Sequence, residues 1–207
     1  FGQMLSLLLE GRLSRDDSAV SEQTSALINS LSRSAGSSVN VNEVFAVHYE
    51  QAMALMEAEG MAVIANGVVS GTGMRPENED VRAIAKRLNT LPAGENFATN
   101  ELRKLLPEAD AYKEVAAGLV SIPISKSPRD YIIFFRPELR RVVKWAGNPE
   151  KPASLGPNGI RLTPRKSFEA WQESVTGKSA DWTEVELSLV ESLRVTLLEV
   201  ILRVTDE

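Results

Sequence analysis

The chain contains no cysteine and only one histidine among its 207 residues. Without thiols it has no disulfide, no thiolate nucleophile and no cysteine-ligated metal site. One histidine cannot build a multi-histidine metal site, and it leaves a Ser-His-Asp arrangement no choice of partners. That residue, His48, lies between Val47 and Tyr49 in an expected helix, so we interpret it as a packed or surface side chain. The lack of cysteine fits a cytoplasmic protein.

The sequence also lacks long apolar runs and an excess of basic charge. No apolar stretch is long enough to cross a bilayer, so we expect no membrane partner. The formal net charge is −5, whereas a nucleic-acid-binding face needs concentrated positive charge, so we expect no nucleic-acid partner. A composition of 43% hydrophobic and 25% charged residues fits one globular domain with extensions.

The motifs of common enzyme classes are missing as well. There is no P-loop, no G-x-S-x-G elbow and no dinucleotide-binding glycine set. Gly67, Gly71 and Gly73 cluster, but they follow a hairpin rather than a strand-to-helix turn, so they do not predict a phosphate cradle. We therefore expect this fragment not to be an enzyme.

Hydrophobic periodicity predicts the main helices and strands. Helices are expected over residues 3–34, 40–57, 80–91 and 181–206, and strands over 61–65, 68–70, 119–125, 131–135 and 140–145. Asn66-Gly67 is a strong hairpin-turn signal between the first two strands. Helices on the faces of an antiparallel sheet give an α+β domain, which resembles the GAF/PAS-like plan of small sensory modules.

The strands are expected to differ in burial. Residues 131–135 are continuously apolar, which predicts a central strand buried on both faces. Residues 119–125 alternate between apolar and small or polar side chains, which predicts a half-buried strand. The basic residues that follow the central strand are interpreted as the solvated face of an exposed strand; they are Arg136, Arg140, Arg141 and Lys144.

Three helices begin with residues that commonly act as caps. The predicted caps are the pairs Asn40 with Glu43 and Asp181 with Glu184, and Asn100 for a short helix that ends near Pro107. Both ends of the chain lie within apolar helical patterns. We therefore expect an internal module of a longer protein.

The last helix carries an apolar stripe close to heptad spacing, formed by Val190, Leu193, Leu197, Val200 or Ile201, and Val204. The first half of this stripe fits packing on its own domain and packing on another helix equally well. The end of the helix is expected to meet another helix. The side chains of Val190, Leu193, Leu197 and Val204, together with an N-terminal stripe of Met4, Leu5 and Leu8, predict a weak parallel homodimer.

The most informative stretch is a pair of motifs on either side of a Pro/Gly-rich connector. The motifs are Trp145-Ala146-Gly147-Asn148-Pro149 and Pro164-Arg165-Lys166-Ser167-Phe168, the second followed by Trp171-Gln172-Glu173. Residues 150–160 cannot form a helix or a long strand, so the arms predict a long hairpin that extends beyond the core. In a strand Arg165 and Ser167 share a face, whereas in a helix they lie about 200° apart. The segment therefore has two self-consistent amphipathic arrangements.

These motifs resemble the tongue of phytochromes, in which a W-(G/A)-G-x-P arm leads out and a P-R-x-S-F arm leads back, followed by W-x-E. The chain is thereby similar to the PHY domain of a bacterial phytochrome. Arg136-Pro137-Glu138 also falls where the family carries an F-R-x-E stretch. The resemblance implies a connecting helix from an upstream GAF domain over residues 1–36, a PHY core over 37–180 with the tongue at about 144–178, and a C-terminal signalling helix over 181–207.

The resemblance also implies a signal-relay role in a red/far-red photoreceptor. In phytochromes a bilin sits in a GAF domain, and the tongue covers its pocket. The arginine of P-R-x-S-F pairs with a GAF aspartate in the red-absorbing state, and the serine takes over after light refolds the tongue from sheet to helix. Carried onto this chain, the contact residues are Arg165 and Ser167, with Pro164, Phe168, Trp145, Gly147, Trp171 and Glu173 in support.

The implied partners are the GAF domain with its biliverdin in the same parent chain and an output domain beyond residue 207. We expect no cofactor on this fragment itself, because it offers no cysteine for covalent attachment of a bilin. The residues leave two alternatives open. One is a stand-alone GAF-like sensor with its own small-molecule pocket, and the other is a dimerisation scaffold.

Overall fold

The computed structural model describes residues 20–34, 41–125, 129–139 and 176–205 of the chain. Within this part, five strands form one antiparallel sheet in the order β2-β1-β5-β4-β3. The strands are β1 (Gly60–Ala65), β2 (Val68–Gly73), β3 (Phe97–Thr99), β4 (Gly118–Pro123) and β5 (Tyr131–Arg136). The α-helices are a helix over residues 20–34, α2 (Val41–Ala46), α3 (Tyr49–Leu55), α4 (Asn78–Leu88) and α7 (Glu184–Thr205).

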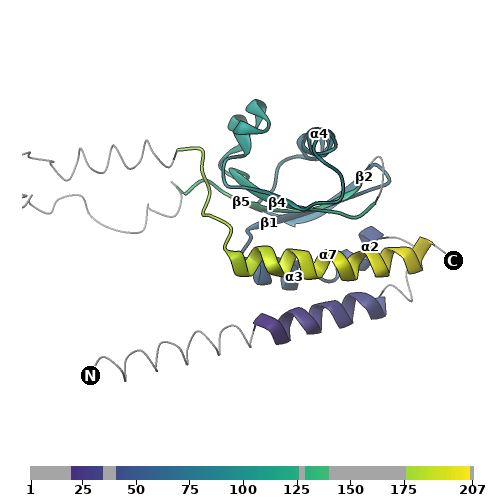
Figure 1. Cartoon of the computed structure of the whole chain (residues 1–207). Helices are drawn as coiled ribbons and strands as arrows, with labels where there is room; N and C mark the ends of the chain where they lie inside the picture. The colour runs from purple at the N-terminus through teal and green to yellow at the C-terminus, as the bar shows by residue number, and fades with distance from the viewer. Residues whose placement is uncertain (1–19, 35–40, 126–128, 140–175, 206–207) are drawn as a thin grey trace, which may run out of the picture.

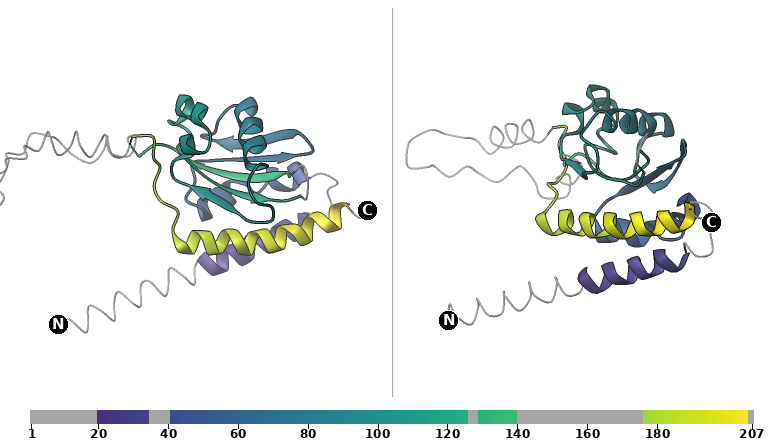
Figure 2. Two further views of the ribbon diagram at one scale, coloured as in Figure 1. Left: turned by 45° about the horizontal axis from the view of Figure 1, so that its top comes forward. Right: turned by 45° about the vertical axis from the view of Figure 1, so that its right-hand side comes forward.

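Helices cover both faces of the sheet (Figure 1). One face carries α4 and the two 3-10 helices η1 (Leu102–Lys104) and η2 (Pro107–Tyr112). The other face carries α2, α3, α7 and the helix over residues 20–34, and Figure 2 shows the same layers from two further directions. The helix over residues 20–34 runs in the same direction as α7. The predicted α+β class is confirmed, whereas the predicted protruding hairpin lies outside the described residues.

The central strand β5 shows why the sheet needs helices on both faces. Its side chains alternate, so Ile132 and Phe134 join the core on the α7 side and Ile133 joins the core on the α4 side. Every residue of β5 is buried, and the strand lies third among the five. The prediction of a central strand buried on both faces is confirmed.

β4 is buried along its whole length, so the prediction of a half-buried strand is wrong. Leu119 packs in the core on the α4 side, while Val120 and Ile122 pack in the core on the α7 side. The sheet edge is taken by β3, a strand of 3 residues that periodicity does not reveal. Its Ala98 pairs with Val120, so β3 exists through a long-range pairing rather than a local pattern.

The β1–β2 hairpin and α4 follow their sequence signals. Asn66 and Gly67 have φ of 52° and 77°, which is the geometry of a type I′ turn. α4 buries the predicted face, formed by Val81, Ile84, Ala85 and Leu88. The helix ends at Leu88 rather than at residue 91, where the chain turns back toward β3.

The helix predicted over residues 40–57 is broken into α2 and α3 by Val47 and His48. His48 is 8% exposed, and its Nε2 lies 3.1 Å from Ser34 Oγ at the end of the helix over residues 20–34. Burial lowers the pKa of His48, and the charge of Arg33 lowers it further. His48 is thus a packed side chain that joins two helices. The expected cap Asn40 lies outside the described residues.

The caps at the other two helix starts differ from the predictions. At α7 the capping box consists of Thr183 and Glu186, because the Thr183 N–H donates to Glu186 Oε2 at 2.7 Å and the Glu186 N–H donates to Thr183 Oγ1 at 3.2 Å. The predicted pair of Asp181 with Glu184 is therefore wrong. Asn100 does not cap η1 either, since Glu101 occupies the position before its first residue.

The first half of the α7 stripe packs on its own domain. Val190, Leu193 and Leu197 are at most 3% exposed and belong to the core that also contains Leu27 and Leu31. The prediction of a dimer contact through these three side chains is wrong, because they are already covered within the chain. The side chains of Val200, Ile201 and Val204, which continue the stripe, lie outside the described part.

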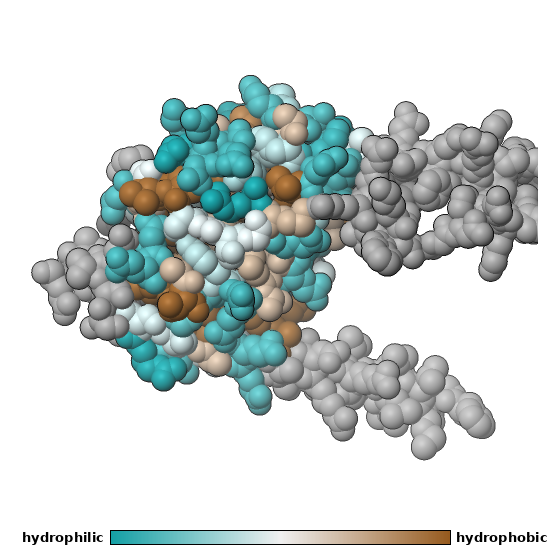
Figure 3. Space-filling view, turned by 180° about the vertical axis from the view of Figure 1, so that it is seen from behind, coloured by the Kyte–Doolittle hydropathy of each residue, from teal (hydrophilic) through white to brown (hydrophobic). Residues whose placement is uncertain are grey.

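The surface is mixed in character. Figure 3 shows hydrophilic residues over most of one face, with apolar residues in small separate groups. In the described ranges the exposed large apolar side chains are Val47, Val68, Val185, Leu187 and Val195. The last three lie on α7, and the other two lie on separate parts of the chain. Scattered apolar residues of this kind are normal for a folded domain. Within the described residues, none of the helices combines the length and the apolarity that a bilayer crossing requires.

Candidate functional site at the junction of β5 and α7

The residues that the motifs predict as a site lie outside the described part of the chain. They are Trp145, Gly147, Pro164, Arg165, Ser167, Phe168, Trp171 and Glu173, all within residues 140–175. The structure instead describes the two ends of that segment, at residues 137–139 after β5 and 176–183 before α7. These ends meet at one junction, which no sequence motif had marked as a site.

The two ends are hydrogen-bonded to each other. The Leu139 N–H donates to the Lys178 carbonyl at 2.8 Å, and the Gly177 N–H donates to the Glu138 carboxylate. Glu138 is 4% exposed, and its own N–H donates to the Lys113 carbonyl at 3.0 Å. We call residues 138–139 and 177–179 the stem. The stem holds together positions that are 39 residues apart in the sequence.

The stem is packed tightly against the loop that contains η1. Gly177 has φ of +74°, and a Cβ there would lie 2.8 Å from Arg103 Cζ, so glycine suits the position in both conformation and space. Ser179 is 1% exposed, and its N–H donates to the Asn100 carbonyl at 2.9 Å. A Cβ at Gly118 on β4 would overlap with Ser179 Oγ. The return arm of the stem is therefore fixed to the sheet.

Arg136, the last residue of β5, is 6% exposed, so the interpretation as part of a solvated basic face is wrong for this residue. Its guanidinium donates to the carbonyls of Met56 at 3.0 Å, Glu57 at 3.2 Å and Asp181 at 2.7 Å, and to the Glu186 carboxylate. A guanidinium has five N–H donors in a planar fork, which suits it to several acceptors at once. Burial is tolerated because the charge has both an ion-pair partner and hydrogen bonds.

Trp182 and Glu186 complete the site around Arg136. The guanidinium lies 3.9 Å from the centroid of the Trp182 ring, a cation–π contact, and Trp182 Nε1 donates to the Thr99 carbonyl at 3.2 Å. Glu186 uses one carboxylate oxygen for Arg136 and the other for the capping box of α7. A carboxylate in the first turn also suits the helix dipole. We call Arg136, Trp182 and Glu186 the clamp.

A further charged group lies on the η1 side of the stem. Glu101 is buried and pairs with Arg103 at 2.9 Å and with Lys104 at 2.7 Å. The hydrogen bond from Lys104, followed by that from Arg103, holds the pKa of Glu101 below its ordinary value despite the burial. The Arg103 guanidinium thus pairs with Glu101 and also lies beside the stem glycine Gly177. Two sequence signals lay at this junction, namely the match of Arg136-Pro137-Glu138 to the family's F-R-x-E stretch and a charged Arg136 that directly continues an apolar run. Neither signal predicted that the two ends of the segment meet here.

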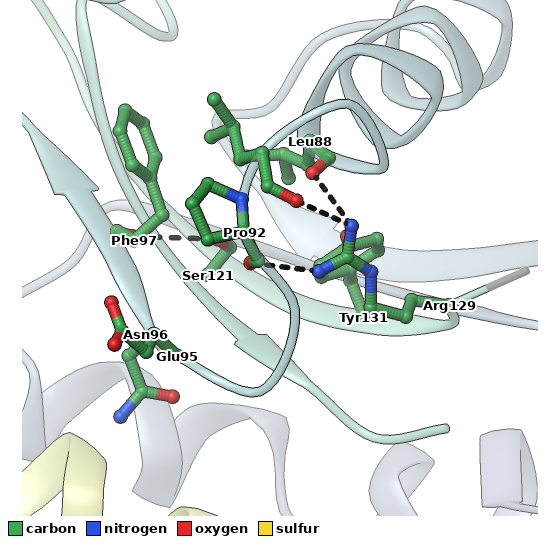
Figure 4. Close-up of a pocket in the computed structure, with 9 residues that line it drawn as sticks. Leu88, Pro92, Glu95, Asn96, Phe97, Ser121, Arg129 and Tyr131 are labelled. Carbon is green, nitrogen blue, oxygen red and sulfur yellow. Dashed lines mark hydrogen bonds between the residues drawn. The ribbon is translucent and has the colours of Figure 1, made fainter. Parts of the chain in front are cut away.

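The opposite end of β5 borders a cavity of about 190 Å³ (Figure 4). Typical small-molecule pockets hold about 300–1,000 Å³. Two charged residues, Glu95 and Arg129, line this cavity. Arg129 donates to the carbonyls at the end of α4 instead of pointing unpaired into the space. The size of this cavity and the hydrogen bonds of Arg129 therefore do not favour a ligand at this end of β5.

These features define an α+β domain in which the ends of a long inserted segment are fixed beside a C-terminal helix. The chain belongs to the phytochrome family, because its residues 22–206 match the family model of the phytochrome region, PHY. It is 33% identical over its whole length to cyanobacterial phytochrome B of Nostoc sp., of which it covers 28%. It is 36% identical to cyanobacterial phytochrome A of the same organism over 77% of its length, which is 21% of that protein.

A solved structure agrees with the family assignment. A crystal structure of a bacteriophytochrome from the photosynthetic bacterium R. palustris superposes with a TM-score of 0.65 at 26% identity. The match covers 96% of this chain and 39% of that one. The chain thus corresponds to one region of proteins that are several times longer.

Proposed function

We propose that this PHY domain relays the light state of a red/far-red bilin photoreceptor to an output domain. Its tongue, at about residues 144–178, covers the chromophore pocket of a neighbouring GAF domain and switches between sheet and helix. The single observation that carries the proposal is the stem, which fixes both ends of the segment with the tongue motifs beside the first turn of α7. A structural change within that segment can therefore reach the C-terminal helix through the few residues between the stem and α7.

Within the tongue, Arg165 pairs with a carboxylate of the GAF domain in one state, and Ser167 replaces it in the other. Support comes from the two amphipathic arrangements of the segment, because exchanging strand for helix changes which of these residues faces a fixed partner. Pro164, Phe168, Trp145, Gly147, Trp171 and Glu173 pack around that contact. Biliverdin is held by the parent receptor, since this chain has no thiol for attaching it.

The partners in this proposal are the GAF domain, the output domain and a second copy of the receptor. Residues 1–36 come from the GAF side, 37–180 form the core with the tongue, and 181–207 lead to the output. The helix over residues 20–34 runs in the same direction as α7, which suits a weak parallel dimer of whole receptors. Such a dimer would use side chains other than Val190, Leu193 and Leu197, because these are buried.

The test is difference spectroscopy on the full-length receptor with Arg165→Ala and with Lys166→Ala as the matched control. Lys166 is the neighbouring cation, and in a strand it faces the opposite side from Arg165. Arg165→Ala should alter photoconversion or dark reversion, because it leaves a buried carboxylate without its charge-assisted partner. Lys166→Ala should leave both unchanged. An unchanged photocycle in Arg165→Ala would reduce the tongue to a passive cover or leave the chain as a scaffold.

A further inference from the structure

We infer that Arg136 is a positioning residue that transmits movement of the tongue to α7 through Trp182 and Glu186. This rests on the proposed function, since it takes the tongue to be the moving part. The clamp gives Arg136 a role distinct from that of the tongue residues. It determines whether a displacement of the stem reaches the helix.

Arg136 joins segments that are otherwise separate in the sequence. Met56 and Glu57 lie just after α3, Asp181 lies on the return arm beside the stem, and Glu186 lies in the first turn of α7. Arg136 itself leads directly into Glu138 of the stem. One side chain thus connects the outgoing arm, the return arm, the helical layer and the start of α7.

The link between the stem and α7 is held at every step. Only residues 180–183 separate the stem from the helix. At the end of the stem the Ser179 N–H donates to the Asn100 carbonyl. Within the link the Asp181 carbonyl accepts from Arg136, and the Trp182 ring is stacked on Arg136. Thr183 belongs to the capping box. A chain so constrained passes on a displacement, whereas a free linker of the same length would absorb it.

The chemistry of the clamp requires arginine rather than a cation in general. The guanidinium is planar, so it can stack on Trp182 while its edge donates to four acceptors. The ammonium group of lysine is compact and has three donors, so it cannot do both. A buried ion pair of this kind is also weak evidence for stability, because apolar replacements are often as stable. These two points favour a role in holding geometry, and they make Arg136→Lys and Glu186→Gln the informative variants.

Glu186→Gln removes the ion pair but keeps the capping box, because glutamine also serves at this position of the box. Arg136→Lys keeps the positive charge but loses the fork and the stacking. The matched control is Arg129→Lys, which makes the same substitution in an arginine that binds backbone carbonyls at the other end of β5. All three variants are made in the full-length receptor.

The readout is amide hydrogen exchange of residues 184–190 in the red- and far-red-adapted states, measured beside the chromophore difference spectrum. In the wild type and in Arg129→Lys we expect the amide exchange rates of these residues to differ by about fivefold or more between the two light states. In Glu186→Gln and Arg136→Lys the difference should fall below about twofold, while the difference spectrum keeps its shape. If Arg136→Lys gives no folded receptor, Glu186→Gln alone decides.

The inference is overturned if Glu186→Gln keeps the full light-dependent difference in exchange, or if Arg129→Lys loses it to the same extent. Failure of the proposed function looks different. In that case the wild type itself shows no light-dependent exchange in residues 176–205, and Arg165→Ala has a normal photocycle. A merely structural role for the clamp would lower the melting temperature in both light states without removing the difference between them.

Discussion

β5 carries an arginine near each end, and the structure uses the two in opposite ways. Arg129, just before the strand, donates to carbonyls within residues 88–92, which form one local turn after α4 (Figure 4). Arg136, at the last position, binds residues as far apart as Met56 and Glu186. The first arginine closes a local turn, and the second connects the domain to its C-terminal helix. The same residue type therefore fixes one turn or connects several elements, depending on whether its acceptors lie in one segment or in several.

The difference between the two arginines should be largest in the stability of the variants Arg136→Ala and Arg129→Ala. Arg136→Ala leaves the Glu186 carboxylate buried without its partner, which should lower the free energy of unfolding by about 3–5 kcal/mol. Arg129→Ala removes hydrogen bonds at a half-buried site where water can replace them, so about 1–2 kcal/mol is expected. Denaturant unfolding of both variants measures the difference. Equal losses would mean that the two ends of β5 contribute alike.

The tight packing of the junction predicts a second, smaller effect. Gly118→Ala places a Cβ against Ser179 and should cost about 1–3 kcal/mol through overpacking. Adding Ser179→Ala removes the nearest atom, the hydroxyl oxygen, and should recover part of the loss. A double-mutant cycle by thermal unfolding gives the coupling. Strictly additive effects would show that β4 and the stem are not in contact.

The smallest effect concerns pH and the Glu101 carboxyl beside the stem. Its pKa is lowered in the folded chain, first by the Lys104 hydrogen bond and then by Arg103, so the folded state binds fewer protons than the unfolded state. The stabilisation is complete above about pH 5 and is lost as the pH falls below about 4. Glu101→Gln should therefore be less stable than the wild type at neutral pH, and the two should converge in acid. A difference in stability between Glu101→Gln and the wild type that stays constant over this pH range would show that the Glu101 carboxylate does not stabilise the fold.

Much of the fold follows from local patterns. Residues 131–135 are continuously apolar, α4 repeats its apolar residues at helical spacing, and Asn66-Gly67 specifies a hairpin turn. Each of these signals acts within a few neighbouring residues. β3 could not be predicted in the same way, because its 3 residues become a strand only by pairing with β4.

The junction was hidden from sequence reasoning for the same reason. The stretch before α7 contains two overlapping cap patterns, Asp181 with Glu184 and Thr183 with Glu186, and local chemistry does not choose between them. Arg136 selects the second by holding the Glu186 carboxylate from 50 residues away. The burial of Arg136 depends on the same distant partner. The tongue motifs identified the family, and only the folded chain shows what the ends of that segment are attached to.

The proposed relay requires that residues between the stem arms change structure with light. The most direct test is the light-minus-dark infrared difference spectrum of the full-length receptor, compared with a variant in which a short Gly/Ser linker replaces residues 145–174. We expect the wild type to exchange strand for helix absorption in the amide I band, and we expect this exchange to disappear in the variant. An amide I difference that persists without residues 145–174, or its absence from the wild type, would contradict the account.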